Sequence, residues 1–213
     1  MTNNNTTLYY IHDPMCSWCW GFKPVWQELT QQLKDKVSIV YIVGGLAADS
    51  DLPMATSMQQ NLAATWQRIQ QQIPGTQFNF DFWDPASNTQ PRRSTYPACR
   101  AVLAAKAQGP HSEQGMILGI QQAYYLQAKN PSNLDVLTSV AAGIGLNPEQ
   151  FEHDVASAAI EQQLEQQLQL ARSMPIQGFP SLVLAKEKQL HPIPLNYTNS
   201  QAMLDVINRH ISN

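Results

Sequence analysis

The sequence has 213 residues, 43% hydrophobic and 14% charged, with a formal net charge of −3 at pH 7. Length and composition fit one globular domain, or one domain that carries a large insertion. The slight acidic balance argues against nucleic acid or an anionic membrane as a partner. The longest apolar stretch, residues 37–48, is too short to cross a bilayer and contains two glycines.

The N-terminal segment, residues 1–7, is polar and uncharged, without the basic start and apolar core of a secretion signal. For a complete chain this predicts a cytoplasmic protein. Three cysteines, an odd and low number, do not suggest a structural disulfide framework. In a reducing compartment, paired cysteines are typical of catalysis or metal binding instead.

The first part of the chain predicts a strand, a helix and a second strand. The apolar run 8–11 is typical of a buried strand. Apolar residues at three- and four-residue steps predict a helix over residues 16–33, and a β-branched run predicts a strand over 37–43. Elements in this order and spacing form a βαβ unit, in which the two strands pair in parallel.

The middle of the chain is predicted to be helical, because apolar residues recur at helical spacing and each run is closed by proline or glycine. The predicted helices cover residues 54–73, 98–108, 116–124, 134–144, a helix that starts near 148, and 160–171.

Two strands, over 181–185 and 189–193, and a helix over 204–211 close the chain. The strands form an antiparallel pair and, with the first strands, bracket the helical block. The sequence therefore predicts an α/β fold with a large inserted helical domain. Its domain limits are 1–50 and 175–213 for the split domain and 51–174 for the insertion.

The motif Cys16-Ser17-Trp18-Cys19 starts the first predicted helix, directly after a strand. A helix start offers unpaired N–H groups and a positive partial charge, which lower cysteine pKa values to roughly 3.5–7.5. Two intervening residues place the second sulfur one turn deeper, within disulfide reach. Cys16 is therefore the predicted nucleophile, more exposed and more acidic than Cys19, which resolves the mixed disulfide. Trp18, between the sulfurs, is predicted to present an apolar surface to substrate.

Two prolines add to this motif. Pro24 lies inside the first predicted helix, where a proline removes a hydrogen bond and bends the helix. Pro180 lies directly before a predicted strand. A cis bond there would expose the N–H and C=O of Phe179 for pairing with a substrate strand beside the sulfurs. We therefore expect Pro180 to be cis and to face Cys16.

Together these motifs resemble the DsbA-like branch of the thioredoxin superfamily, and more narrowly its cytoplasmic predicted disulfide isomerases and FrnE-like proteins. The matching pieces are the runs 9–22 and 178–183, Pro24 and the helical insertion. The resemblance implies a thioredoxin fold, with Cys16 as nucleophile, Cys19 as resolving thiol and Pro180 as the cis proline of the substrate groove. It implies a protein or small-molecule thiol or disulfide as partner, and no cofactor. Ser17-Trp18 replaces the Pro-His dipeptide of the periplasmic oxidants, so a strongly oxidising potential does not carry over.

Two sets of basic residues have two interpretations each. His12, four residues before Cys16, either tunes the charge of that thiol or is a strand-end histidine hydrogen-bonded to backbone. The arginines either bind an anionic substrate such as glutathione or form a solvated basic patch. They are Arg92, Arg93 and Arg100.

Cys99 lies at the opening turn of a predicted insertion helix, with Ser94 or Thr95 available as cap. It is either an extra resolving thiol or redox sensor close to Cys16, or a small buried hydrophobe, as most free cysteines are.

Two other functions stay open. A glutathione-dependent transferase or isomerase, of the kappa or hydroxychromene carboxylate isomerase type, shares the fold, but such enzymes usually carry serine at the position of Cys16. A zinc-binding or redox-inactive module needs four ligands, of which Cys16 and Cys19 supply two. Cys99 and a histidine would have to complete that set, and no second C-x-x-C exists. No metal site is predicted.

Overall fold

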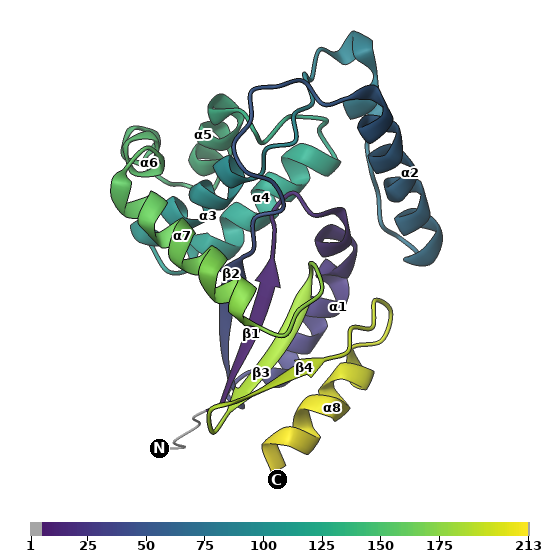
Figure 1. Ribbon diagram of the computed structural model, residues 1–213, viewed down its shortest axis with the longest axis vertical. Helices are drawn as coiled ribbons and strands as arrows, with labels where there is room; N and C mark the ends of the chain where they lie inside the picture. The colour runs from purple at the N-terminus through teal and green to yellow at the C-terminus, as the bar shows by residue number, and fades with distance from the viewer. Residues whose placement is uncertain (1–5, 213) are drawn as a thin grey trace.

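A mixed four-stranded sheet forms the centre of the computed structural model, which describes residues 6–212 (Figure 1). The strands are β1 (Thr6–His12), β2 (Ser38–Val43), β3 (Ser181–Lys186) and β4 (Gln189–Ile193). Their order across the sheet is β2-β1-β3-β4. β1 pairs with β2 in parallel and with β3 antiparallel, and β3 pairs antiparallel with β4. The predicted βαβ unit and the predicted antiparallel pair are both confirmed.

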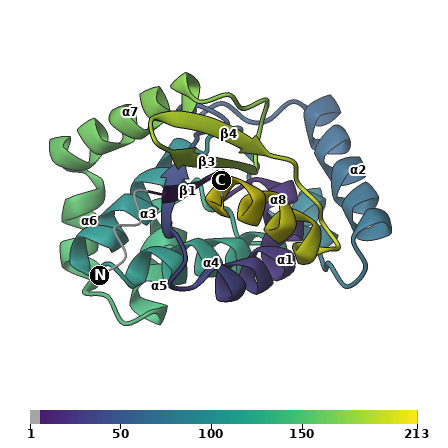
Figure 2. The same cartoon turned by 90° about the horizontal axis from the view of Figure 1, so that it is seen from below.

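One face of the sheet is covered by α1 (Ser17–Leu33) and α8 (Ser200–Ser212). The predicted apolar stripe of α1 is buried there, and the helix continues past Pro24 to its end at Leu33. The opposite face carries Ile11, Ile42 and Val183, which pack against the end of α7 (Ala158–Ser173). Figure 2 shows the sheet as the middle layer between α7 and the pair α1 and α8.

Six α-helices and two short 3₁₀ turns of the described chain lie between β2 and β3. Besides α7 they are α2 (Thr56–Gln72), α3 (Tyr96–Gln108), α4 (Ser112–Tyr125), α5 (Leu134–Gly143) and α6 (Pro148–Val155). Helix α3 contacts each of the helices α4 to α7. Its alanine-rich sequence explains this position, because small side chains allow neighbouring helices to approach closely. The predicted α/β fold with a helical insertion is confirmed; the domain limits stay a prediction.

Helix α2 stands to one side of the other inserted helices (Figure 1). Of its residues only Trp66 and Ile69 are buried. The Trp66 ring stacks on Phe78 at 4.9 Å between centroids and meets Tyr125 of α4 at 5.3 Å. Aromatic rings therefore attach α2 to α4, since the rest of the helix surface faces outward or is only partly covered.

No helix within residues 6–212 is long and apolar enough to cross a membrane. Residues 1–5 of the polar N-terminal segment lie outside the described residues, so the absence of a secretion signal stays a prediction.

Candidate active site

Cys16, predicted as the first residue of the helix, occupies its cap position, one residue before α1 begins at Ser17. Its backbone N–H donates to the Asp13 carbonyl at 3.0 Å, and its carbonyl accepts from Trp20 N at 3.1 Å. No side chain caps this helix start. The N–H groups of the first turn therefore stay available to a negative charge that develops at the cap.

The two thiols of the motif differ in burial. Cys16 is 6% exposed and Cys19 is 1% exposed, in the predicted order. Burial raises the pKa of the Cys19 thiol well above its usual range, and the neighbouring Cys16 raises it further. Burial therefore favours the neutral thiol form of Cys19.

The segment before β3 lies against Cys16, as predicted. The bond between Phe179 and Pro180 is cis, and the Cys16 thiol donates to the Phe179 carbonyl oxygen at 3.4 Å. This places a backbone carbonyl beside the outer sulfur. The roles of Phe179 and Pro180 in substrate binding stay predictions.

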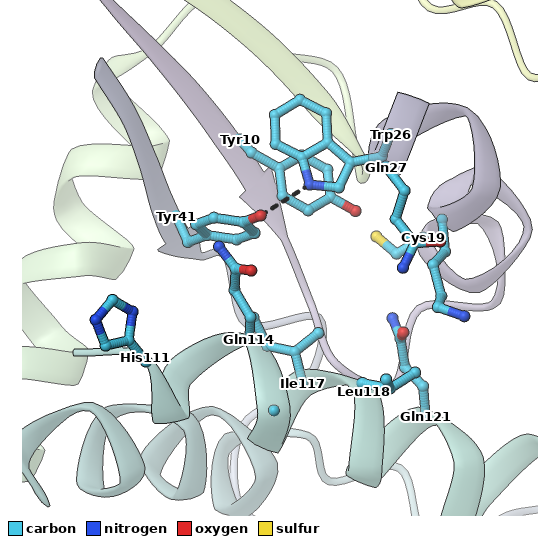
Figure 3. Close-up of a pocket in the computed structure, with 12 residues that line it drawn as sticks. Tyr10, Cys19, Trp26, Gln27, Tyr41, His111, Gln114, Ile117, Leu118 and Gln121 are labelled. Atoms are coloured by element: carbon cyan, nitrogen blue, oxygen red, sulfur yellow. Dashed lines mark hydrogen bonds between the residues drawn. The ribbon is translucent and has the colours of Figure 1, made fainter. Parts of the chain in front are cut away.

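Each sulfur of the motif borders its own cavity. A hollow of about 230 Å³ is lined by Cys16, Trp18 and Phe179 together with Arg92 and Arg93. A second cavity, of about 350 Å³, borders Cys19 instead and lies between α1, the sheet and α4 (Figure 3). The Cys16 hollow has the thiol, an apolar wall and two cations, so it is the candidate substrate site.

The three arginines differ in their surroundings. Arg92 donates from one terminal nitrogen to the Ser132 carbonyl at 3.0 Å, while its Nε has no hydrogen-bond partner within residues 6–212. Arg100 lies elsewhere and pairs with Asp49 and Glu161. Anion binding beside Cys16 is therefore open to Arg92 and Arg93, whereas Arg100 is engaged in ion pairs.

Trp18 is only partly buried and lines the Cys16 hollow, but it is not free on the surface. Its ring meets Tyr197 edge-on at 5.3 Å between centroids. This contact joins the Cys16–Cys19 motif to the segment before α8. Trp18 therefore offers one side of its ring to the hollow.

Gly44, directly after β2, is one of the two glycines in the apolar stretch 37–48 and was not predicted to belong to the site. A Cβ at this position would lie 2.1 Å from the Phe179 ring. Only a residue without a side chain lets Phe179 lie flat against this turn. A glycine doublet after a parallel strand was the available signal.

Gly44→Ala is expected to slow disulfide exchange by about tenfold with the fold retained. The added methyl displaces Phe179, and with it the carbonyl that contacts Cys16; a misplacement of about 1 Å can cost a hundredfold in rate. The measurement is the rate of insulin reduction, together with thermal unfolding. Gly143→Ala, whose added methyl meets no atom within 4 Å, is the matched control. An unchanged rate in Gly44→Ala would show that Phe179 need not be held there.

Asp13 is a second residue of this site that the sequence did not reveal. Its carboxylate is fully buried and accepts from Met15 N at 2.8 Å, Leu46 N at 2.7 Å and Thr95 Oγ1 at 2.7 Å. It thus ties the loop before Cys16 to the segment after β2 and to the start of α3. Burial raises the pKa of Asp13, and these hydrogen bonds oppose the shift.

Cys99 is fully buried on α3, which matches its interpretation as a small hydrophobe. Its thiol donates to Asp13 Oδ2 at 3.7 Å, and burial raises its pKa well above the usual range. This burial favours the interpretation as a small hydrophobe, and a role as an extra resolving thiol or redox sensor stays a prediction. Thr95 takes the predicted cap position of α3, but its hydroxyl donates to Asp13 instead of capping the helix.

His12 fits neither of its two interpretations. The ring is fully buried and stacks on Tyr10 at 5.1 Å, and neither ring nitrogen has a hydrogen-bond partner among the described residues. Burial lowers the pKa of His12 to about 3, so the ring is neutral at physiological pH. A neutral ring supplies no charge to Cys16, and the predicted backbone partner is absent. His12 contributes aromatic packing on the same strand face as Tyr10.

In the part of the chain that the structure describes, no three histidine, cysteine, aspartate or glutamate side chains gather in a metal-binding arrangement.

Comparison with known families and structures agrees with this architecture. The sequence model of a family described as thioredoxin matches residues 9–201. A candidate protein disulfide isomerase from Nitrosomonas europaea has a TM-score of 0.85 and 25% identity, over 97% of this chain and 98% of that chain. The cytosolic disulfide reductase DsbM from Pseudomonas aeruginosa has a TM-score of 0.77 and 22% identity, over 97% and 98% of the two chains. DsbM is also known in a structure with GSH.

Curated relatives carry a different name. The ClpXP adapter protein SpxH of Halalkalibacterium halodurans is 26% identical over 182 residues, which are 83% of this chain and 57% of that protein. SpxH of Bacillus subtilis is 25% identical over 198 residues, 85% of this chain and 64% of that protein. The chain thus spans less than two thirds of the length of these relatives.

Proposed function

Since this chain belongs to the thioredoxin family, we propose that it is a thiol-disulfide oxidoreductase in which Cys16 attacks and Cys19 resolves. The observation that carries the proposal is the position of Cys16. Its sulfur lies at the uncapped start of α1, 3.4 Å from the Phe179 carbonyl, and borders a hollow. A helix start supports a thiolate, and the carbonyl offers a hydrogen bond to a substrate backbone.

The two thiols support a two-step exchange. The Cys16 thiolate attacks one sulfur of a substrate disulfide, and the other sulfur leaves as a thiolate that takes up a proton. Cys19 then loses its proton and attacks the Cys16 sulfur, which releases the second substrate thiolate and leaves a Cys16–Cys19 disulfide. A thiol reductant returns the protein to the dithiol. The reverse sequence oxidises a dithiol substrate, and the two directions in alternation would isomerise disulfides.

We infer that the small thiol handled at Cys16 is glutathione. Its two carboxylates suit Arg92 and Arg93, whose guanidinium groups form charge-assisted hydrogen bonds with carboxylates. The unpartnered Nε of Arg92 is a buried donor without an acceptor in the described chain. The similar fold of DsbM, known with GSH, and its cytosolic location favour a cytoplasmic protein of this kind.

The Cys19→Ala variant tests the function and its partners. Without a resolving thiol, the variant should stall as a mixed disulfide at Cys16 when incubated with oxidised glutathione or expressed in cells. Intact-mass measurement and peptide mapping identify the adduct and its position. Cys16→Ser is the matched control and should carry none. Absence of any reducible adduct on Cys19→Ala would contradict the oxidoreductase proposal.

The curated relatives raise a second candidate function, that of a proteolytic adapter. An adapter binds its partner through a surface and needs no sulfur chemistry. A variant with serine at both Cys16 and Cys19 separates the candidates: it keeps its bound proteins if the chain is an adapter and loses them if binding proceeds through mixed disulfides. A glutathione transferase, which needs no second thiol, would instead keep its turnover in Cys19→Ala.

A further inference from the structure

The cavity of about 350 Å³ beside Cys19 has no part in the exchange described above. Figure 3 shows the Cys19 sulfur and the Tyr10 hydroxyl close together at one side of it, with α4 opposite. Its wall combines aromatic rings with three amide side chains. The amides belong to Gln27, Gln114 and Gln121.

Packing against neighbouring rings holds the side chain of Tyr10 in one orientation. Tyr10 lies in β1 and is 4% exposed, and its ring stacks between Trp26 at 4.5 Å and His12 at 5.1 Å. Its hydroxyl lies beside the Cys19 sulfur at this cavity (Figure 3), and the two groups interact electrostatically. This stacking on two rings restrains the side chain, so the hydroxyl stays beside the sulfur at the cavity wall.

Cys19 meets a chemical difficulty in the second step of exchange. Its thiol is almost completely buried, yet it must lose a proton before it can attack the Cys16 sulfur. The titratable groups that interact with Cys19 or share its cavity come from every surrounding element. From the sheet they are Tyr10 of β1 and Tyr41 of β2. From α1 and the loop before it they are Asp13, Cys16 and Lys23. From α4 and the residue before it they are Tyr125 and His111, and Tyr197 lies before α8.

Most of these groups are unsuited to receive the proton. The Asp13 carboxylate is already occupied by four donors. Tyr41 accepts from Trp26 Nε1 at 3.0 Å. Of these groups, only Tyr10 combines a hydroxyl beside the thiol with a position on the cavity wall.

We propose that Tyr10 is the proton relay of the resolving thiol and that the cavity between α1 and α4 is the exit for the proton. The inference rests on the resolving role of Cys19 in the proposed function. The Cys19 S–H proton passes to the Tyr10 oxygen while the Tyr10 O–H proton passes to water in the cavity. The resulting Cys19 thiolate attacks the Cys16 sulfur, and Tyr10 ends as it began. A cavity of this size exceeds the roughly 30 Å³ that one water occupies in the liquid, and its amides can hold such a chain.

Tyr10→Phe removes the relay oxygen and keeps the stacked ring. The reduced protein is mixed with one equivalent of an aromatic disulfide that releases a coloured thiolate. A first release reports attack by Cys16, and a second reports resolution by Cys19. In Tyr10→Phe the first phase should keep its rate while the second slows by about tenfold or more at pH 7. The second phase should recover as the pH rises, because hydroxide then removes the proton.

Tyr41→Phe is the matched control, since it also loses a hydroxyl at this cavity but none that contacts Cys19. It should leave both phases at the wild-type rate. Gln114→Phe, at an exposed position on the cavity wall, should narrow the cavity and slow the second phase alone. An unchanged second phase in Tyr10→Phe, or equal slowing of both phases, would overturn the relay. The assay needs no natural substrate and separates the two proposals: a wild type without a second phase would contradict the resolving role of Cys19, whereas a second phase that Tyr10→Phe leaves unchanged would overturn the relay alone.

Discussion

Replacing Cys16 by serine is expected to reduce insulin reduction to the uncatalysed background, a loss of at least about a thousandfold. Cys16 is the outer thiol of the pair, at 6% exposure against 1% for Cys19. A serine hydroxyl is not a nucleophile toward disulfides, and Cys19 is too buried to replace it. Turbidity of the precipitating insulin chains, with a thiol as the reductant, measures the rate.

Alkylation supplies the control for this assignment. Iodoacetamide at neutral pH should modify Cys16 well before Cys19 in the wild type, and Cys16 should react as fast in a Cys19→Ser variant. Faster labelling of Cys19 would exchange the two roles, and full activity in Cys16→Ser would exclude the mechanism altogether.

Asp13→Ala is expected to lower the free energy of unfolding by about 3 kcal/mol or more. The N–H groups of Met15 and Leu46, in part-buried hydrogen bonds, and the hydroxyl of Thr95, in a buried one, would lose their acceptor, and a buried group left unsatisfied costs about 1–3 kcal/mol. Denaturant unfolding followed by tryptophan fluorescence measures the change. Asp49→Ala, which removes a half-exposed partner of Arg100, should cost less than about 1 kcal/mol. Equal losses in the two variants would contradict the role assigned to Asp13.

The same site gives a pH dependence with a defined sign. Burial raises the pKa of Asp13 above its value in the unfolded chain, so the folded protein binds this proton more tightly. The contribution to stability is full below the unfolded pKa and is lost as the pH rises through the folded pKa. Relative to the neutral Asp13→Asn variant, the wild type should therefore lose stability as the pH rises.

Local patterns were sufficient to predict most of the fold. The apolar stripe of α1 and the apolar pattern of the strands are formed by residues close to one another in sequence, so the sequence alone predicts these elements. Strand β4 accordingly has the predicted limits. Helix α8, by contrast, begins at Ser200, four residues before the predicted start at its second buried apolar side chain. The Asn199 side chain accepts from Gln201 N and Ala202 N at the start of this helix, and the prediction began at an apolar residue instead of at this cap.

The candidate site likewise contains residues that local motifs predict and residues that they do not. Cys16, Cys19 and Pro180 belong to short motifs whose chemistry depends on position in one strand or helix. Asp13 and Gly44 act on residues distant in sequence, so no spacing rule finds them. Tyr10 appeared as one apolar residue of a buried strand. Its hydroxyl comes to lie beside Cys19 only because α1 packs against β1.

The pairing of β1 with β3 affects the order in which the chain folds during synthesis. Residue 11 of β1 lies opposite residue 181 of β3, and all the inserted helices lie between them in sequence. During synthesis from the N-terminus, β1 and β2 leave the ribosome long before β3 exists. The helices α3 to α7, which contact one another, can pack before the sheet closes, because contacts close in sequence form faster than distant ones. The Phe179 carbonyl therefore reaches Cys16 only at the end of folding, and until then the thiol of the nascent chain lacks its partner.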